Sequence, residues 1–332
     1  MLRIGVVGAG HLGKIHLRIL SSIQEICLSG FFDTNPVTRQ QVSEENGLDG
    51  FTGFTELLDA SDALVVVSPT TTHYYYAALG MQAGKHLFIE KPLTHTIAEA
   101  MDLAERAALI PVKVQVGFVE RFNPAYEAAS PSIHRPLFIE SHRLAMFQSR
   151  GTDVSVVMDL MIHDLDILLE VVGSPVERID ASGVSILSAT ADIANARISF
   201  QNGCVANLTA SRFSMKQMRK MRIFQSDAYI SLDFLEKKSQ IIALSDEMPR
   251  EGPFLELTIQ DAQKKYIRIT EPEILPSNAI EMELRHWIKS ITYDEKVAVS
   301  LQDGIEALRL AHSIENIIAQ NLSKTPSYSE YN

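Results

Sequence analysis

Residues 2–33 read LRIGVVGAGHLGKIHLRILSSIQEICLSGFFD, and this stretch decides the fold of the first part of the chain. It begins with a short apolar run, Leu2–Val7, and then passes through a glycine-rich turn. Helical spacing follows over Leu12–Ser22, and a second apolar run, Cys27–Phe32, ends at Asp33. Short apolar runs rich in β-branched residues are typical of buried strands, and their alternation with helices is typical of parallel sheets with right-handed crossovers. The stretch therefore predicts the opening strand–helix–strand unit of an α/β domain.

The same alternation continues to about residue 120. Apolar runs at Ala63–Val67 and around Phe88–Ile89 predict two further strands. Helical spacing over His73–Gly84 and Ile97–Ala108 predicts helices between and after them. We therefore expect the first domain to be built on an open parallel sheet.

The pattern changes after Pro124. Apolar and polar residues alternate over Asp192–Phe200, and the turn Gln201–Gly203 leads to a second alternating run at Cys204–Ala210. A further alternating run, Ile230–Phe234, follows the next turn. Alternating strands joined by short turns predict an antiparallel sheet that is buried on one face. The other face of such a sheet contacts water or a partner.

The two patterns predict two domains. The first comprises residues 1–121, and the second comprises residues 122–332 and has an α+β fold with a large open-faced, mainly antiparallel sheet. Helical spacing at Ala279–Ile291 and Leu301–Asn321 predicts two closing helices, within about 279–322, that pack back near the first domain.

Composition excludes several classes of function. The net charge of −11 argues against non-specific nucleic-acid binding, and no apolar stretch approaches the roughly 18 residues that a membrane span needs. Hydrophobic residues make up 46% of the chain, as in ordinary globular proteins. Cys27 and Cys204 have no metal or redox spacing, and glycines interrupt the N-terminal apolar run. We therefore expect a cytoplasmic protein with reduced thiols and no metal.

The glycine-rich turn predicts a dinucleotide site. Glycines in this pattern permit a tight turn and let the backbone approach a pyrophosphate at the helix N-terminus. Asp33 follows 20 residues after Gly13, where a carboxylate accepts hydrogen bonds from the adenosine ribose and repels a 2′-phosphate. Arg39 is the nearest arginine after it, so the pattern favours NAD over NADP. The residues expected to bind the cofactor here are Gly8, Gly10, His11, Leu12, Gly13 and Asp33.

Two further segments follow predicted strands at the ligand-binding edge of the parallel sheet. Glu90 and Lys91, with Pro92, come directly after the fourth strand, so Lys91 is positioned to hydrogen-bond a ribose and a substrate hydroxyl. A plain surface lysine is the alternative. Ser68, Pro69, Thr70 and His73 would lie beside the cofactor, although their hydroxyls would serve equally well as helix caps.

An unusual ionisable pattern occupies residues 159–166. At helical pitch Asp159, His163 and Asp166 fall on one narrow stripe in an otherwise apolar segment. Buried ionisable groups cost free energy unless they are paired or used, and an aspartate one turn from a histidine can orient the imidazole as a proton acceptor. A metal site and a purely structural buried pair are the alternatives. Nearby, Arg121 and Asn123 either line a substrate cleft or brace the hinge between domains.

Together these residues resemble the Gfo/Idh/MocA family of oxidoreductases over essentially the whole chain. The resemblance rests on Gly8–Gly13 with His16, on Ser68–His73, on Glu90-Lys91-Pro92, on Asp159 with His163, and on Val299–Gly304. It implies a Rossmann domain, a second domain whose open-faced sheet joins a homodimer or homotetramer, and a catalytic trio that maps onto Lys91, Asp159 and His163. One departure is that Val156-Val157-Met158 and Leu160-Met161 flank Asp159, where many members have glycines.

Within the family, Val116–Ala125, Asp159–Asp166 and Met221–Gln225 resemble the UDP-N-acetylglucosamine 3-dehydrogenase branch. This implies hydride transfer between NAD and a secondary alcohol of a sugar or nucleotide sugar. The alternatives are a free-sugar, inositol or trans-dihydrodiol dehydrogenase, and a non-catalytic NAD-sensing regulatory protein. A basic subsite for a diphosphate would separate the enzyme alternatives, and the expected members of that subsite are Arg143, Arg150, Arg212 and Lys216.

Overall fold

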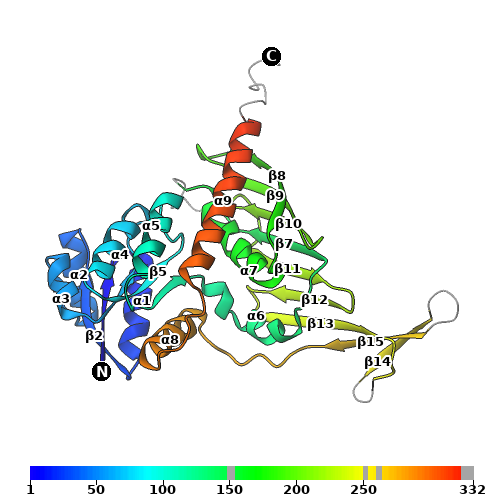
Figure 1. Cartoon of the computed structure of the whole chain (residues 1–332), viewed down its shortest axis with the longest axis horizontal. Coiled ribbons are helices and arrows are strands. Elements are labelled where there is room, and N and C mark those ends of the chain that lie inside the picture. Colours follow the sequence, from blue (N-terminus) through cyan, green and yellow to red (C-terminus); the bar gives the residue numbers. More distant parts are fainter. Residues whose placement is uncertain (148–153, 250–252, 259–263, 323–332) are drawn as a thin grey trace, which may run out of the picture. The chain divides into compact units, whose positions relative to one another are not determined.

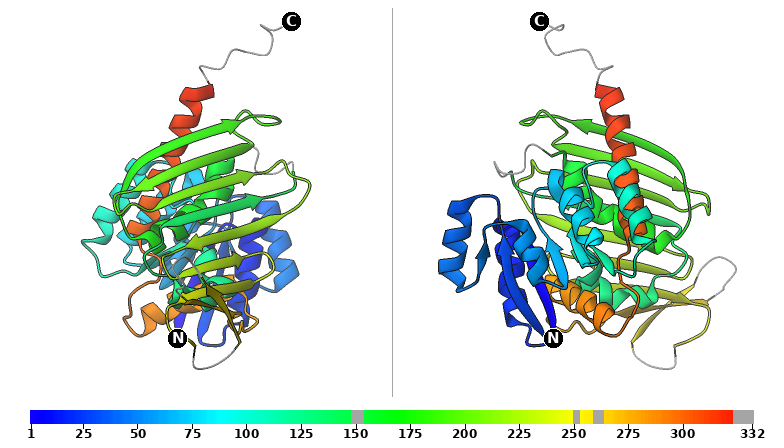
Figure 2. Two further views of the ribbon diagram at one scale, coloured as in Figure 1. Left: turned by 90° about the vertical axis from the view of Figure 1, so that its right-hand side faces the viewer. Right: turned by 60° about the vertical axis from the view of Figure 1, so that its left-hand side comes forward.

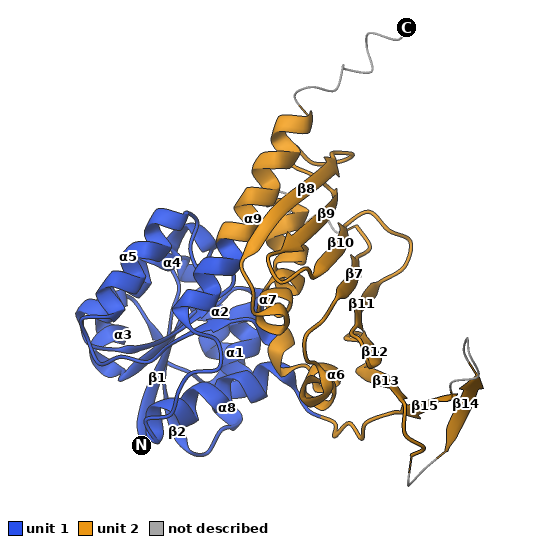
Figure 3. Cartoon of the chain, turned by 45° about the vertical axis from the view of Figure 1, so that its right-hand side comes forward, with its two compact units in different colours: residues 1–119, 277–308 blue, residues 120–276, 309–332 orange. Residues whose placement is uncertain are grey.

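The structure is a computed structural model that describes residues 1–147, 154–249, 253–258 and 264–322. It contains two compact units, which Figure 3 shows in blue and orange. Unit 1 comprises Met1–Val119 with Ser277–Leu308, and unit 2 comprises Glu120–Pro276 with Arg309–Asn332. The expected Arg150 lies outside the described residues.

Unit 1 is built on a parallel sheet whose strands lie in the order β3-β2-β1-β4-β5-β6. All strands run in one direction, as the sequence pattern predicted. The order reverses direction between β1 and β4, and in open sheets of this kind ligands bind outside the carboxyl ends of the strands at such a point. The strands are β1 (Leu2–Val7), β2 (Ile26–Phe32), β3 (Gly50–Phe51), β4 (Ala63–Val66), β5 (His86–Glu90) and β6 (Val114–Gly117).

Helices pack on both faces of this sheet, so its central strands are apolar on both sides. On one face Ile4, Val65 and Phe88 join a core with Leu17 of α1 and Trp287 of α8. The opposite face carries α3 and α4, which contact β1, β2, β4 and β5. The helices are α1 (His11–Ser22), α2 (Pro36–Asn46), α3 (Phe54–Ala60), α4 (His73–Gln82), α5 (Ile97–Ala107) and α8 (Ala279–Thr292), with the short 3-10 turn η1 (Thr70–Thr72) before α4.

Unit 2 is built on a second sheet with the strand order β14-β15-β13-β12-β11-β7-β10-β9-β8. Its pairs are antiparallel except for β7 and β10, which run parallel. The prediction of a large, mainly antiparallel sheet is therefore confirmed. The strands are β7 (Phe138–Leu144), β8 (Val176–Val184), β9 (Ile193–Phe200), β10 (Val205–Ser211), β11 (Met218–Phe224), β12 (Ala228–Asp233), β13 (Lys238–Ser245), β14 (Phe254–Thr258) and β15 (Lys264–Thr270).

The two faces of the second sheet differ in their surroundings. On β9 the face formed by Ala194, Ala196, Ile198 and Phe200 is buried, as the alternation predicted. Helices lie over this face, whereas the left view of Figure 2 looks onto the other face, with no helix of the described part of the chain in front of it. The elements of unit 2 on the covered side are α6 (Pro124–Ala129), a π-helical turn (Val157–Met161), α7 (Ile162–Val172) and the Arg309–Leu322 part of α9 (Leu301–Leu322) (Figure 1).

Hydropathy gives one further result. Among the helices of the described residues, none combines the length and the apolar character that crossing a membrane requires.

Candidate functional site

The glycine-rich turn of unit 1 forms a compact loop between β1 and α1. Gly8 has φ +102°, and a Cβ atom there would come within 2.7 Å of the Ser68 backbone nitrogen. A Cβ on Gly13 would collide with the Gly8 carbonyl oxygen, so Gly13 lets helix and strand approach. A Cβ on Gly10, by contrast, would meet nothing within 4 Å. The loop is thus tightly packed at Gly8 and Gly13 and has open space at Gly10, as a pyrophosphate site at a helix N-terminus requires.

Asp33 stands at the carboxyl end of β2, directly beside this loop. Its Oδ2 atom accepts a hydrogen bond from the Ala9 backbone N–H at 2.8 Å, and its Oδ1 atom accepts one from Asn35 at 2.9 Å. A carboxylate has about four acceptor sites, so these two bonds orient it and leave capacity for ribose hydroxyls. The Arg39 guanidinium donates to the Asp33 carbonyl oxygen at 2.6 Å. The nearest arginine is thus held by the backbone of Asp33.

A pocket of about 350 Å³ opens between the glycine-rich loop and the end of β4. Tyr76 and Phe32 supply an aromatic wall, and burial raises the pKa of the Tyr76 hydroxyl above its ordinary value. The lining residues that the sequence analysis expected are Gly8, Gly10, His11, Leu12, Asp33, Ser68 and Pro69, and those it missed are Val7, Phe32, Thr34, Val67, Thr72 and Tyr76. Gly13, Thr70, His73, Glu90 and Lys91, all among the described residues, do not line this pocket.

Two buried histidines hold the segment around Lys91. His16 of α1 contacts the Glu90 carboxylate, Nε2 to Oε1, at 2.8 Å, and the other Glu90 oxygen accepts the Lys91 backbone N–H at 3.2 Å. His73 lies between the Pro92 carbonyl oxygen, 2.9 Å from Nδ1, and the Ser68 carbonyl oxygen, 2.8 Å from Nε2. Burial lowers the pKa of His73, although both carbonyl contacts act in the opposite direction. His73 therefore ties the Lys91 loop to the Ser68 turn from behind.

In unit 2 the ionisable segment is a buried helix with one partly open strip. Every residue from Ser155 to Leu168 is buried except Asp159, Leu160 and His163. Asp159 lies in the π-helical turn, and His163 lies in the first turn of α7. The structure therefore brings the two expected catalytic side chains of this unit to the same strip of an otherwise buried element.

Asp166, the third member of the expected stripe, serves a different purpose. It is buried and accepts two hydrogen bonds from Arg121, Nε at 2.8 Å and Nη2 at 2.7 Å. Arg121 also forms an ion pair with Glu170 at 2.8 Å. Asn123 is buried too: it caps α6 through the Ala125 N–H. In this structure Arg121 and Asn123 make contacts that brace the start of unit 2.

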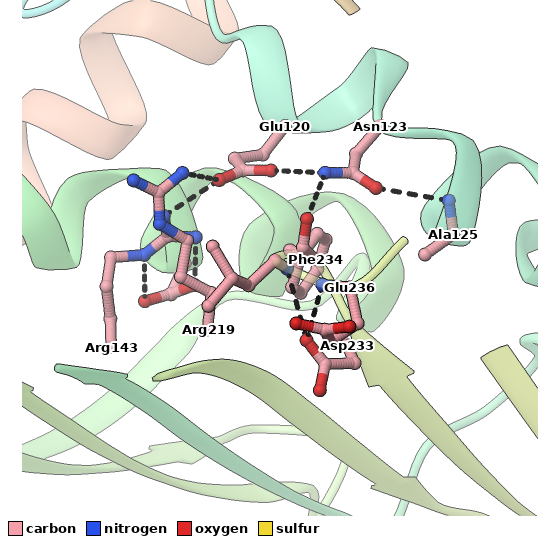
Figure 4. Close-up of polar contacts among 10 residues, drawn as sticks. Glu120, Asn123, Ala125, Arg143, Arg219, Asp233, Phe234 and Glu236 are labelled. Carbon is pink, nitrogen blue, oxygen red and sulfur yellow. Dashed lines mark hydrogen bonds and ion pairs between the residues drawn. The ribbon is translucent and has the colours of Figure 1, made fainter. Parts of the chain in front are cut away.

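Arg143 joins a buried polar network near the same helix (Figure 4). Its guanidinium makes a bidentate contact with Asp164 at 2.9 and 2.8 Å and donates to Glu120 Oε1 at 2.8 Å. Glu120 Oε2 accepts a hydrogen bond from Asn123 at 2.9 Å. Burial alone would lower the pKa of Arg143, but Asp164 and Glu120 raise it well above the ordinary value. Because Asp164 adjoins His163 in sequence, this network anchors the helix that carries the histidine.

The other expected basic residues have distinct surroundings. Arg212 is buried, donates to the Val154 carbonyl oxygen, and lies 3.7 Å from Asp192. Lys216 is exposed. Arg143 and Arg212 line one pocket of about 180 Å³ together with Asp159, and Arg219, which the sequence analysis did not select, lines it as well. Among the described residues, no group of three histidine, cysteine or acidic side chains has the arrangement of a metal site.

Family models match both units of the chain. The model described as "Oxidoreductase family, NAD-binding Rossmann fold" covers residues 2–118, and the "GFO/IDH/MocA C-terminal domain" covers residues 134–231. The chain belongs to the Gfo/Idh/MocA family. It is an oxidoreductase with an NAD-binding Rossmann domain, and its glycine loop, Asp33 and the adjoining pocket fit that cofactor.

Known relatives agree with this assignment. The chain is 39% identical over 241 residues to a UDP-N-acetylglucosamine 3-dehydrogenase of Acidithiobacillus ferrooxidans, covering 72% of this chain and 76% of that protein. It is 24% identical to a myo-inositol 2-dehydrogenase of Thermotoga maritima, covering 97% and 98%. A solved structure of the Acidithiobacillus ferrooxidans enzyme GnnA superposes with a TM-score of 0.87 at 32% identity, covering 97% of this chain and 99% of that one.

Proposed function

We propose that this enzyme transfers hydride between NAD and C3 of a UDP-N-acetylhexosamine, oxidising the 3-hydroxyl group. As a Gfo/Idh/MocA oxidoreductase it is an NAD(P)-dependent dehydrogenase of CH–OH groups. The similarity to the UDP-N-acetylglucosamine 3-dehydrogenase of Acidithiobacillus ferrooxidans carries this proposal.

Three side chains would act on the hydroxyl. His163 takes the hydroxyl proton, and Asp159, one turn earlier, holds the imidazole and stabilises the imidazolium that forms. Lys91 donates a hydrogen bond to the reacting oxygen and polarises it. A bound nicotinamide would supply the acceptor for the hydride. The partly open positions of Asp159 and His163 in a buried helix support these roles, because such a strip keeps two ionisable groups accessible at fixed places.

The arrangement around Lys91 also supports a role in the reaction. The carboxylate of Glu90 and the rings of His16 and His73 fix the backbone on both sides of the lysine. A positioned donor accelerates a reaction by holding the bound geometry near that of the transition state. A plain surface lysine would not need three buried ionisable groups behind it.

The test is a substrate panel with NAD, followed by the absorbance of NADH. We expect UDP-N-acetylglucosamine to give the highest kcat/KM, and NMR of the product to show a ketone at C3. Free N-acetylglucosamine, glucose and myo-inositol should react much more slowly. A higher kcat/KM for myo-inositol or a free sugar would overturn the proposal in favour of the inositol or free-sugar dehydrogenase alternative.

A further inference from the structure

The pocket beside Asp159 has features that the catalytic proposal does not use. It has a volume of about 180 Å³ and is formed within unit 2 alone. Asp159 and Leu160 border it from the π-helical turn, and three arginines border it from the strands and their ends. The remaining lining residues are Leu144, Ala145, Met146 and Gln217. The lining therefore carries three guanidinium groups and one carboxylate, and this excess of positive charge suits an anionic ligand.

The three arginines are not equally available to such a ligand. The buried Arg143 donates hydrogen bonds to Asp164 and Glu120, and the buried Arg212 donates to the Val154 carbonyl oxygen and lies 3.7 Å from Asp192. Arg219 on β11 differs, because 47% of its side chain is exposed. Its Nη1 atom lies 3.6 Å from Glu120 Oε1, which is longer than a hydrogen bond.

Both carboxylate oxygens of Glu120 accept hydrogen bonds from residues other than Arg219. Glu120 Oε1 accepts a hydrogen bond from Arg143 at 2.8 Å, and Oε2 accepts one from Asn123 at 2.9 Å (Figure 4). The Glu120 oxygen nearest to Arg219 is therefore already hydrogen-bonded to Arg143. A half-exposed ion pair at this distance contributes little. The guanidinium of Arg219 can therefore turn to a ligand at small cost, and its planar fork suits a phosphate bidentately.

Exposed apolar side chains occur in the segments that border this pocket. Phe213 follows Arg212 directly and is 48% exposed, Met215 is 94% exposed, and Met146 of the pocket lining is 50% exposed. The segments that carry them are joined, because Ala145 donates to the Ser211 carbonyl oxygen at 2.7 Å and Ser214 donates to the Ala145 carbonyl oxygen at 3.1 Å. Apolar groups beside a phosphate-binding arginine match a ligand that has both a diphosphate and a flat heterocycle.

We propose that this pocket binds the nucleoside diphosphate part of the substrate, with Arg219 on the phosphates and Phe213 against the base. This inference rests on the proposed function and adds the subsite that recognises the nucleotide. Arg219 then has the role that the sequence predicted for Arg143 and Arg212, whose guanidinium groups are buried and donate to other groups of the protein.

The experiment is calorimetric titration of the full chain with UDP, without sugar. Arg219→Ala should weaken UDP binding about tenfold or more, as expected for a charge-assisted contact. Arg219→Lys should recover part of the affinity, and NAD binding should not change. Arg222→Ala is the matched control, since Arg222 lies on the same strand, is 46% exposed, and pairs with Glu140 at 2.8 Å. Phe213→Ser should weaken UDP binding and leave pyrophosphate binding unchanged.

Steady-state kinetics provide the second measurement. Arg219→Ala should raise KM for the UDP-sugar about tenfold and leave kcat within about twofold. The subsite is overturned if Arg219→Ala leaves UDP affinity unchanged, if Arg222→Ala has an equal effect, or if the wild-type protein does not bind UDP. If Arg219-dependent UDP binding is found but UDP-N-acetylglucosamine is not oxidised, the subsite stands and the proposed sugar is wrong. If wild type and Arg219→Ala oxidise UDP-N-acetylglucosamine equally well, the proposed function stands and the assignment of this subsite is wrong.

Discussion

Asp33 Oδ2 accepts a hydrogen bond from the backbone N–H of Ala9 at 2.8 Å. This bond joins the carboxylate at the end of β2 to the glycine-rich loop after β1. The carboxylate is therefore fixed in place before a cofactor binds. The Asp33 carboxylate places a negative charge beside the loop, and the Arg39 guanidinium is engaged by the Asp33 carbonyl oxygen at 2.6 Å.

Cofactor choice follows from this charge. NAD should bind more tightly than NADP, since a 2′-phosphate would meet the Asp33 carboxylate, and the guanidinium of the nearest arginine, Arg39, is engaged by the Asp33 carbonyl oxygen. Asp33→Ser should reduce the ratio of the NADP Kd to the NAD Kd by about tenfold or more. The control Asp59→Ala removes an exposed carboxylate of the same unit and should leave both affinities unchanged. Calorimetric titration that gave tighter NADP binding to the wild-type protein would contradict this prediction.

Catalysis should depend on three side chains that lie in different units. Lys91→Ala and His163→Ala should each retain NAD binding and lose at least about 100-fold in kcat, as expected when a positioned hydrogen-bond donor or proton acceptor is removed. Asp159→Asn should also be slow, because an amide cannot stabilise an imidazolium. His95→Ala, an exposed histidine near Lys91 in sequence, should keep near-normal turnover. Near-normal turnover of Lys91→Ala or His163→Ala would remove that residue from the mechanism.

Association of two chains is predicted for the face of the second sheet that helices leave open. Phe224 of β11 lies between Phe138 and Tyr229 on this face, with ring centroids 5.7 and 4.9 Å away. Exposed aromatic clusters of this kind mark protein interfaces. We expect a dimer or tetramer by light scattering, and Phe224→Asp should shift it toward monomer, whereas Val37→Asp on unit 1 should not. A wild-type monomer at micromolar concentration would disprove the prediction.

The buried arginine network should contribute strongly to stability. Arg143→Met would leave the Asp164 and Glu120 carboxylates buried without this partner, which costs about 3 to 5 kcal/mol when a buried ion pair is broken. The exposed pair of Arg178 and Asp180 is a suitable comparison, because Arg178→Ala should change the free energy of unfolding little. Urea unfolding measures the change in the free energy of unfolding for both variants. Equal effects would mean that the network does not stabilise the fold.

Local patterns account for what the sequence predicted correctly. The strand, glycine-rich turn and helix that open unit 1 and the alternation on β9 are encoded within a few residues, because turn geometry, helix pitch and strand period act at short range. Helical spacing alone placed Asp166 on one stripe with Asp159 and His163. Its actual partner, Arg121, is 45 positions away, and spacing carries no information about a contact at that distance.

Long-range pairing accounts for the features that the sequence did not predict. The parallel pair of β7 and β10 joins segments about 67 positions apart. Asn123 donates to the carbonyl oxygen of Phe234, 111 positions away. The roles of His16 and His73 likewise depend on Glu90 and Pro92, which only the folded sheet brings near them. Helix α2 was missed for a different reason: Val42 is its only buried residue, so it shows almost no apolar period.

Asp192 gives the chain a predicted dependence of stability on pH. It is buried, and its Oδ2 atom accepts hydrogen bonds from the backbone N–H groups of Ile186, Leu187 and Ser188 at 2.7, 2.6 and 3.0 Å. Burial alone would raise the pKa of this carboxyl, but the hydrogen bonds to the charged form outweigh burial and hold the pKa below its ordinary value of 3.8. A lowered carboxyl pKa stabilises the folded state above the unfolded pKa, and this contribution is lost as the pH falls.

The free energy of unfolding should therefore decrease as the pH drops below about 4, and part of this decrease should be absent in Asp192→Asn. The asparagine keeps one oxygen acceptor but loses the charge, so we expect a loss of about 2 kcal/mol at pH 7 and a flatter acid profile. Asp180→Asn, which changes an exposed carboxylate of the same unit, should leave the profile of the wild-type protein nearly unchanged. Urea unfolding between pH 3 and pH 7 separates the two variants. If the free energy of unfolding of Asp192→Asn fell with decreasing pH as steeply as that of the wild-type protein, the charge of Asp192 would not account for the acid sensitivity.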